Sequence, residues 1–143
     1  MGPTKFNLQR FLDAQEDMYP VALKEMKKGA KRSHWIWYIF PQQKGLGYSY
    51  NSQYYGLDGE EEARAYLQHP VLGTRLREIS RALLAHRGHR SVLELMGSEV
   101  DVLKLRTSME LFNQVAPGDV FGEVLEAYFP TVSYTHLTLP TIA

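Results

Sequence analysis

Hydrophobic side chains recur every three or four positions along most of this 143-residue chain, which is the spacing of amphipathic α-helices. The pattern predicts a helix over residues 6–15, with Asn7 as its N-cap. A second helix over residues 20–28 begins with Pro20, which suits a first turn, and ends at Gly29. The N-terminal part of the chain is therefore expected to form two short helices.

The second half of the chain carries the strongest helical periodicity. The predicted helices cover residues 58–69, 71–86, 98–112 and 119–129, and a short capped turn covers residues 91–97. Three of these elements open on the residue spacing of an N-terminal cap: Asp58 with Glu61, Ser91 with Glu94, and Ser98 with Asp101. We therefore expect helices, separated by short turns, from residue 58 onward.

Residues 33–40 (Ser-His-Trp-Ile-Trp-Tyr-Ile-Phe) favour a strand by composition, because aromatic and β-branched side chains dominate. No similar segment lies nearby to pair with them, and a lone strand leaves its backbone unsatisfied. We therefore predict a short buried helix that starts at Ser33 and stops before Pro41. Residues 41–57, rich in Gly, Gln, Asn, Ser and Tyr, follow as one long loop. The expected fold is all-α, a compact single-domain bundle of about seven short helices with this loop near residues 41–57.

Composition limits the class of protein without naming a reaction. The chain is 44% apolar and 22% charged, as expected for a globular domain, and its sixteen basic residues balance sixteen acidic ones. This neutral balance argues for neither nucleic acid nor an acidic membrane surface as a partner and leaves binding through a local patch open, and nucleic acid is not the expected partner. The absence of cysteine excludes disulfides and thiol nucleophiles. No apolar stretch reaches the length of a signal peptide or a membrane span, so we expect a cytoplasmic protein without membrane contact.

The last residues resemble something other than evolved protein sequence. Residues 132–141 (Val-Ser-Tyr-Thr-His-Leu-Thr-Leu-Pro-Thr) resemble the translated read-through of a transposase-based sequencing adapter. The alternative is a genuine edge strand or extended arm. We expect residues 1–131 to form the single helical domain and residues 132–143 to be a non-native tail. No functional residue is assigned to the tail, and this includes His136.

Residues 31–49 hold the densest group of chemically useful side chains. Both tryptophans, a histidine, several basic residues and a Gly-Leu-Gly turn gather there. Flat aromatic walls with a few directed polar groups are typical of a small-molecule pocket. His34 is the candidate acid–base group, because histidine titrates near neutral pH. The alternative is a tryptophan-rich core helix followed by a turn, with His34 in a capping role.

An anionic or aromatic ligand would use the neighbouring groups. Arg32, Lys44 and Lys104 would hold its negative charge, and Trp35 or Trp37 would stack on a ring. The backbone N–H groups of two glycines, Gly45 and Gly47, would contact an anion. No Ser/His/Asp order, HExxH motif or paired-carboxylate signature occurs, so no reaction class, cofactor or metal is assigned.

Basic side chains also cluster between residues 24 and 32. Lysines and one arginine there precede the tryptophans, a combination that can bind single-stranded nucleic acid. The tryptophans lie in an apolar run, however, so a solvated basic face is favoured, and a nucleic-acid or protein interaction module is the alternative function. For His86 and His89 a solvated helix terminus is favoured over a metal pair, because Gly88 should end the helix between them and Arg87 and Arg90 would repel a cation.

Five segments together resemble a bacterial domain-of-unknown-function family, the one numbered eighteen-ten and often mislabelled "calpastatin". They cover residues 11–15, 31–42, 45–49, 65–73 and 104–109. The resemblance implies a compact, mainly α-helical domain and supplies no activity. The family's motif falls on these candidate site residues: Arg32, Ser33, His34, Trp35, Trp37, Gln42, Gly45, Gly47, Lys104 and Ser108. Residues 32–49 and residues 104–108 form two strips of polar candidate residues that are distant in sequence. The functional prediction requires these two strips to meet at one solvent-reachable hollow.

Overall fold

The computed structural model describes residues 6–130, and these residues are helical and contain no strand. The expected all-α, single-domain fold is confirmed, although this range holds eight helices where about seven were predicted. They are α1 (Gln9–Lys28), α2 (Ile36–Ile39), α3 (Tyr50–Tyr54), α4 (Gly59–Gln68), α5 (Leu72–Leu84), α6 (Val92–Met96), α7 (Glu99–Val115) and α8 (Val120–Tyr128). The predicted foreign tail, residues 132–143 with His136, lies outside the described residues.

The two predicted N-terminal helices are one continuous helix, α1, and Pro20 lies inside it. The prediction of two helices was wrong because the buried face runs straight through the proline. Its buried side chains recur at helical spacing along the whole element: Phe11, Gln15, Tyr19, Ala22 and Met26. Pro20 is exposed on the opposite face, and Asn7 does not cap the helix, since the N-cap position is Leu8.

Other element boundaries also differ from the prediction. α2 starts at Ile36 and not at Ser33, because the Ser33 hydroxyl donates to Glu25 instead of capping a helix. The loop at residues 41–57 is not without structure, since α3 lies within it. The Ser49 hydroxyl caps α3 by accepting from the backbone N–H of Ser52. The capping box of Ser91 with Glu94 and the cap of Ser98 are confirmed.

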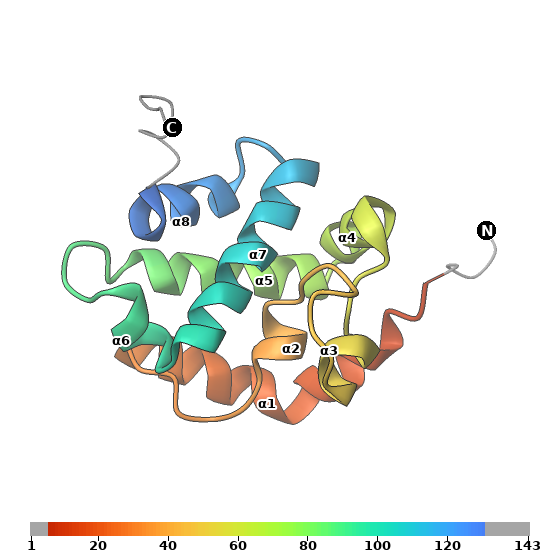
Figure 1. Cartoon of the computed structure of the whole chain (residues 1–143), viewed down its shortest axis with the longest axis horizontal. Coiled ribbons are helices and arrows are strands. Elements are labelled where there is room, and N and C mark those ends of the chain that lie inside the picture. The colour runs from red at the N-terminus through yellow and green to blue at the C-terminus, as the bar shows by residue number, and fades with distance from the viewer. Residues whose placement is uncertain (1–5, 131–143) are drawn as a thin grey trace.

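The helices pack as a bundle in which α5 occupies the middle (Figure 1). α1 and α8 lie on either side of α5, α4 packs against its N-terminal half, and α7 crosses the bundle and contacts α8 and α4. α2 bridges α1 and α7. None of the helices in residues 6–130 combines the length and apolarity needed to cross a bilayer.

A buried polar network ties α1 to the centre of the bundle. The Gln15 amide donates to the backbone oxygen of Tyr38 at 2.8 Å and to the Tyr66 hydroxyl at 3.0 Å. Arg75 donates to the Gln15 side-chain oxygen at 3.2 Å. Burial raises the pKa of the Tyr66 hydroxyl, so it stays neutral. Since buried polar groups require partners, these contacts fix α1 against α2, α4 and α5.

Candidate functional site

A small hollow lies where α2, α3 and α7 meet. Ile36 and Phe40 supply apolar walls, and the remaining lining residues are Trp37, Gln42, Asn51, Ser52, Tyr55, Gly56 and Lys104. Its cavity volume is about 10 Å³, which is room for one water-sized group. The two sequence strips expected to meet therefore do share one hollow.

Three side chains of this hollow offer hydrogen-bond donors, and Asn51, Ser52 and Tyr55 can both donate and accept. The Gln42 side-chain oxygen already accepts from the Thr107 hydroxyl at 2.6 Å, which leaves the Gln42 NH₂ group for another partner. The Trp37 indole and the Lys104 ammonium also donate only. The lining contains no Asp or Glu. The arrangement therefore favours an acceptor, such as a carboxylate or phosphate oxygen.

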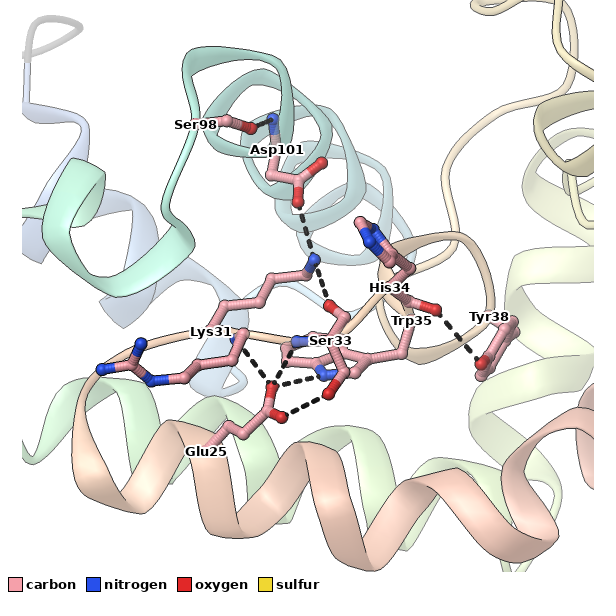
Figure 2. A network of polar contacts seen from close by, with 9 residues as sticks. Glu25, Lys31, Ser33, His34, Trp35, Tyr38, Ser98 and Asp101 are labelled. Atoms are coloured by element: carbon pink, nitrogen blue, oxygen red, sulfur yellow. Dashed lines mark hydrogen bonds and ion pairs between the residues drawn. The ribbon is translucent and has the colours of Figure 1, made fainter.

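The segment that leads into α2 is fixed by one carboxylate, that of Glu25 on α1 (Figure 2). It accepts from the backbone N–H groups of Arg32 (2.9 Å) and Ser33 (3.1 Å). It also accepts from the Ser33 hydroxyl at 2.6 Å and from the Trp35 indole at 2.9 Å. Four donors thus hold residues 32–35 against α1.

The same donors determine the charge state of Glu25. Burial alone would raise the pKa of this carboxyl, but the hydrogen bond from the Ser33 hydroxyl, followed by those from Arg32, Trp35 and the Ser33 backbone, lowers the pKa from 4.5 to about 2. Glu25 is therefore ionised throughout the neutral range.

Lys31 fastens the same segment to α7. Its ammonium lies 2.8 Å from the Asp101 carboxylate and donates to the backbone oxygen of Ser33 at 2.6 Å. It also lies 4.9 Å from the ring centre of Trp35, a cation–π contact. The side chains of Lys31 and Asp101 are 6% and 17% exposed, so the pair is shielded from water. Residues 31–35 are therefore held between α1 and α7.

Arg10 on α1 positions the opposite wall of the hollow. Its guanidinium donates to the backbone oxygens of Tyr54 at 2.8 Å and Gly56 at 3.0 Å. It pairs with Glu62 on α4 at 2.8 Å. The other Glu62 oxygen accepts from the backbone N–H of Asp58 at 2.7 Å. Glu62 thus takes the capping position predicted for Glu61, and the Asp58 side chain caps nothing.

The Gly-Leu-Gly turn lies at the rim of the hollow. A Cβ atom at Gly47 would lie 2.6 Å from the Ser52 hydroxyl oxygen and 3.9 Å from the Lys104 nitrogen. A Cβ atom at Gly56 would lie 2.7 Å from the Lys44 Cα atom. The chain therefore passes close to the hollow at both glycines, and larger residues would displace it.

The structure brings only some of the predicted site residues together. Trp37, Gln42 and Lys104 line the hollow, and Gly47 lies at its rim. Lys44 and Gly45 are exposed in the neighbouring turn. The remaining predicted site residues do not line the hollow: Arg32, Ser33, His34, Trp35 and Ser108.

Each of these remaining residues has a defined place. Ser33 and Trp35 face Glu25, and Trp35 is fully buried. Arg32 and His34 alternate with them and are exposed, and the His34 ring projects away from Glu25 (Figure 2). Ser108 is fully buried, and its hydroxyl has no hydrogen-bond partner among the described residues.

Sequence reasoning missed several residues that form or support the hollow. Asn51, Ser52 and Tyr55 line it, Thr107 orients Gln42, and Glu25 anchors the segment before α2. Ser49 was the one available signal, because serine is a preferred N-cap residue and its hydroxyl accepts from a backbone N–H of the first helical turn. Among the described residues, no three His, Asp or Glu side chains are grouped as metal ligands.

Comparison with known proteins shows what this chain is similar to. A family model described as a protein of unknown function (DUF1810) matches residues 5–140. The crystal structure of the conserved hypothetical protein Rv1873 from Mycobacterium tuberculosis is similar, with a TM-score of 0.84 and 37% sequence identity. That similarity covers 96% of this chain and 100% of the Mycobacterium chain. No curated protein matches the chain.

Proposed function

This chain belongs to the family of proteins of unknown function DUF1810, and we propose that it binds a small molecule through one acceptor group, a carboxylate or phosphate oxygen, seated in the hollow. The observation that carries the proposal is that Trp37 and Gln42 line one hollow together with Lys104, which is distant in sequence, and that this lining has no carboxylate. Desolvated donors with one cation bind an anionic oxygen more strongly than a neutral one.

The size of the hollow limits what part of the ligand enters it. A volume of about 10 Å³ accepts a single oxygen atom, so the rest of the ligand lies across the rim. The rim turn carries Tyr48, which is 92% exposed, and α3 begins with Tyr50, which is 75% exposed. Exposed aromatic faces stack on flat rings. The proposed ligand is therefore a small aromatic or heteroaromatic anion.

Probes that differ only in their charged group test this proposal. Phenyl phosphate and benzoate should raise the unfolding temperature, because a ligand that binds the native state stabilises it. Benzylamine carries the same ring with a positive charge and should give no shift. Calorimetric titration of phenyl phosphate then supplies the affinity.

Two matched lysine variants locate the binding. Lys104→Met keeps the aliphatic stem and removes the charge from the hollow, and should weaken phenyl phosphate binding about tenfold or more, as expected for one charge-assisted hydrogen bond. Lys24→Met removes the same charge from an exposed position on α1 and should leave the affinity unchanged. Equal affinities for the two variants would contradict the proposal, as would equal responses to phenyl phosphate and benzylamine.

The acid–base role of His34 stays a prediction. Its ring is exposed in the segment before α2, three residues before Trp37, and does not line the hollow. His34→Ala with intact folding should reduce ligand binding or turnover. A variant with wild-type affinity for phenyl phosphate would remove His34 from the binding mechanism.

A further inference from the structure

Basic side chains from two distant segments meet at one end of the molecule. α1 ends with Lys27 and Lys28, and the turn after α5 carries Arg87 and Arg90. These four residues are called the basic end below. A Cβ atom at Gly29, which directly follows Lys28, would lie 2.5 Å from Arg90 Nε. Arg90 therefore lies against the C-terminus of α1.

A hydrogen bond holds the two segments in this arrangement. The His86 ring Nε2 lies 2.7 Å from the backbone oxygen of Met26 and donates to it. Gly29 adopts φ +91°, a conformation that favours glycine, and its missing side chain leaves the space that Arg90 and His86 fill. The approach of the two segments is thus part of the fold.

The charges of the basic end are not neutralised within the protein. Among residues 6–130, none of the four takes part in an ion pair, in contrast to Arg10, Lys31, Arg77 and Arg106. All four basic-end side chains are exposed. The whole chain is neutral, with sixteen basic and sixteen acidic residues, so four positive charges here leave an excess of four negative charges elsewhere. Such a separation orients a protein toward a polyanion.

We propose that the basic end binds the phosphate backbone of a nucleic-acid duplex. Neutrality of the whole chain gives no support for nucleic acid, but the structure concentrates positive charge on one surface. The two tryptophans that follow the basic stretch of α1 do not offer a stacking platform for unpaired bases at this end, because Trp35 is fully buried and Trp37 lines the hollow. Cations alone suffice for a duplex backbone, which they contact without reading the sequence. This proposal is independent of the hollow.

The salt dependence of duplex binding tests the number of phosphate contacts. Binding of the full chain to a fluorescent DNA duplex of about 20 base pairs is followed by anisotropy at several salt concentrations. Four phosphate contacts predict a slope of about −3.6 for the logarithm of affinity against the logarithm of salt concentration. Lys28→Gln with Arg87→Gln should reduce the slope to about −1.8. Lys44→Gln with Arg64→Gln, which removes two exposed charges from the 41–57 segment and α4, should leave the slope unchanged.

Three results would overturn the proposal. One is the absence of duplex binding at low salt, and another is an equal loss of slope in both double variants. The third is binding of the wild type to phosphatidylserine vesicles, but not to the duplex, together with loss of vesicle binding in the Lys28/Arg87 variant. That result would assign the basic end to a membrane surface. Basic residues at helix C-termini also stabilise the helix dipole. Urea unfolding of both double variants therefore confirms that each is folded under the binding conditions.

Discussion

Replacement of Glu25 by glutamine tests whether one carboxylate positions the segment that leads into the hollow. Glutamine keeps the shape and one acceptor oxygen but loses the negative charge. Hydrogen bonds to a charged acceptor contribute about 1.5–3 kcal/mol each, against about 0.5–1.5 kcal/mol for neutral ones. Four donors reach this carboxylate, among them the indole of the fully buried Trp35. The variant should therefore be less stable than the wild type at pH 7.

The lowered pKa gives a second measure of the effect. A pKa of about 2 in place of 4.5 corresponds to about 3 kcal/mol for a fully shielded group. Glu25 is partly exposed, so water screens its interactions, and about 1–2 kcal/mol is expected. A carboxyl whose pKa is lowered by folding contributes stability that is complete above its ordinary pKa of 4.5 and is lost as the pH falls toward 2. The difference in free energy of unfolding between the wild type and Glu25→Gln should therefore decrease as the pH falls through this range.

Urea unfolding followed by tryptophan fluorescence measures this difference between pH 7 and pH 3. Glu16→Gln is the matched control, because Glu16 is exposed on the same helix. We expect the control to track the wild type and Glu25→Gln to fall below both at pH 7. Equal stability of the two variants at pH 7, or a deficit in Glu25→Gln that does not shrink between pH 5 and pH 3, would refute the reasoning.

Three further substitutions test separate parts of the structure. Ser108→Ala removes a buried hydroxyl without a hydrogen-bond partner among the described residues, so calorimetry should show a free energy of unfolding that is higher by about 1 kcal/mol. A lower free energy of unfolding would contradict the absence of a partner. Gly73→Ala would place a Cβ atom 2.1 Å from the backbone oxygen of Leu67, so it should destabilise the α4–α5 junction by about 2 kcal/mol or more in urea unfolding, and a neutral effect would contradict that close approach. Lys31→Met leaves the Asp101 carboxylate unpaired and should cost about 3 kcal/mol of unfolding free energy; an equal cost for Lys24→Met would show that the shielded pair contributes nothing.

The helical fold was predictable because its signals are local. Apolar spacing and serine caps identified α4 to α8, and the capping box of Ser91 and Glu94 is present as predicted. α1 was divided in two because its buried face includes Gln15 and Tyr19, whose polar groups are satisfied by distant residues. A pattern based on apolar residues alone misses such positions, and Pro20 then gave a misleading start signal for a second helix.

The hollow was predictable only as a meeting of two strips. Trp37, Gln42 and Lys104 do meet there. The separation of structural from solvent-facing residues in the segment before α2 was not predictable, because it depends on long-range partners. The Trp35 side chain turns inward and donates to Glu25 on α1, while His34, which lies between Ser33 and Trp35, stays exposed. No spacing in the sequence specifies these tertiary contacts.

The two tryptophans provide a direct measurement of where a ligand binds. The chain has two tryptophans, so a ¹H–¹⁵N spectrum shows two indole signals. Trp37 lines the hollow, whereas the fully buried Trp35 donates to Glu25 and serves as an internal control. Titration with phenyl phosphate should shift the Trp37 indole signal saturably and leave that of Trp35 in place. An unmoved Trp37 signal at saturating phenyl phosphate, or equal shifts of both signals, would contradict binding at the hollow.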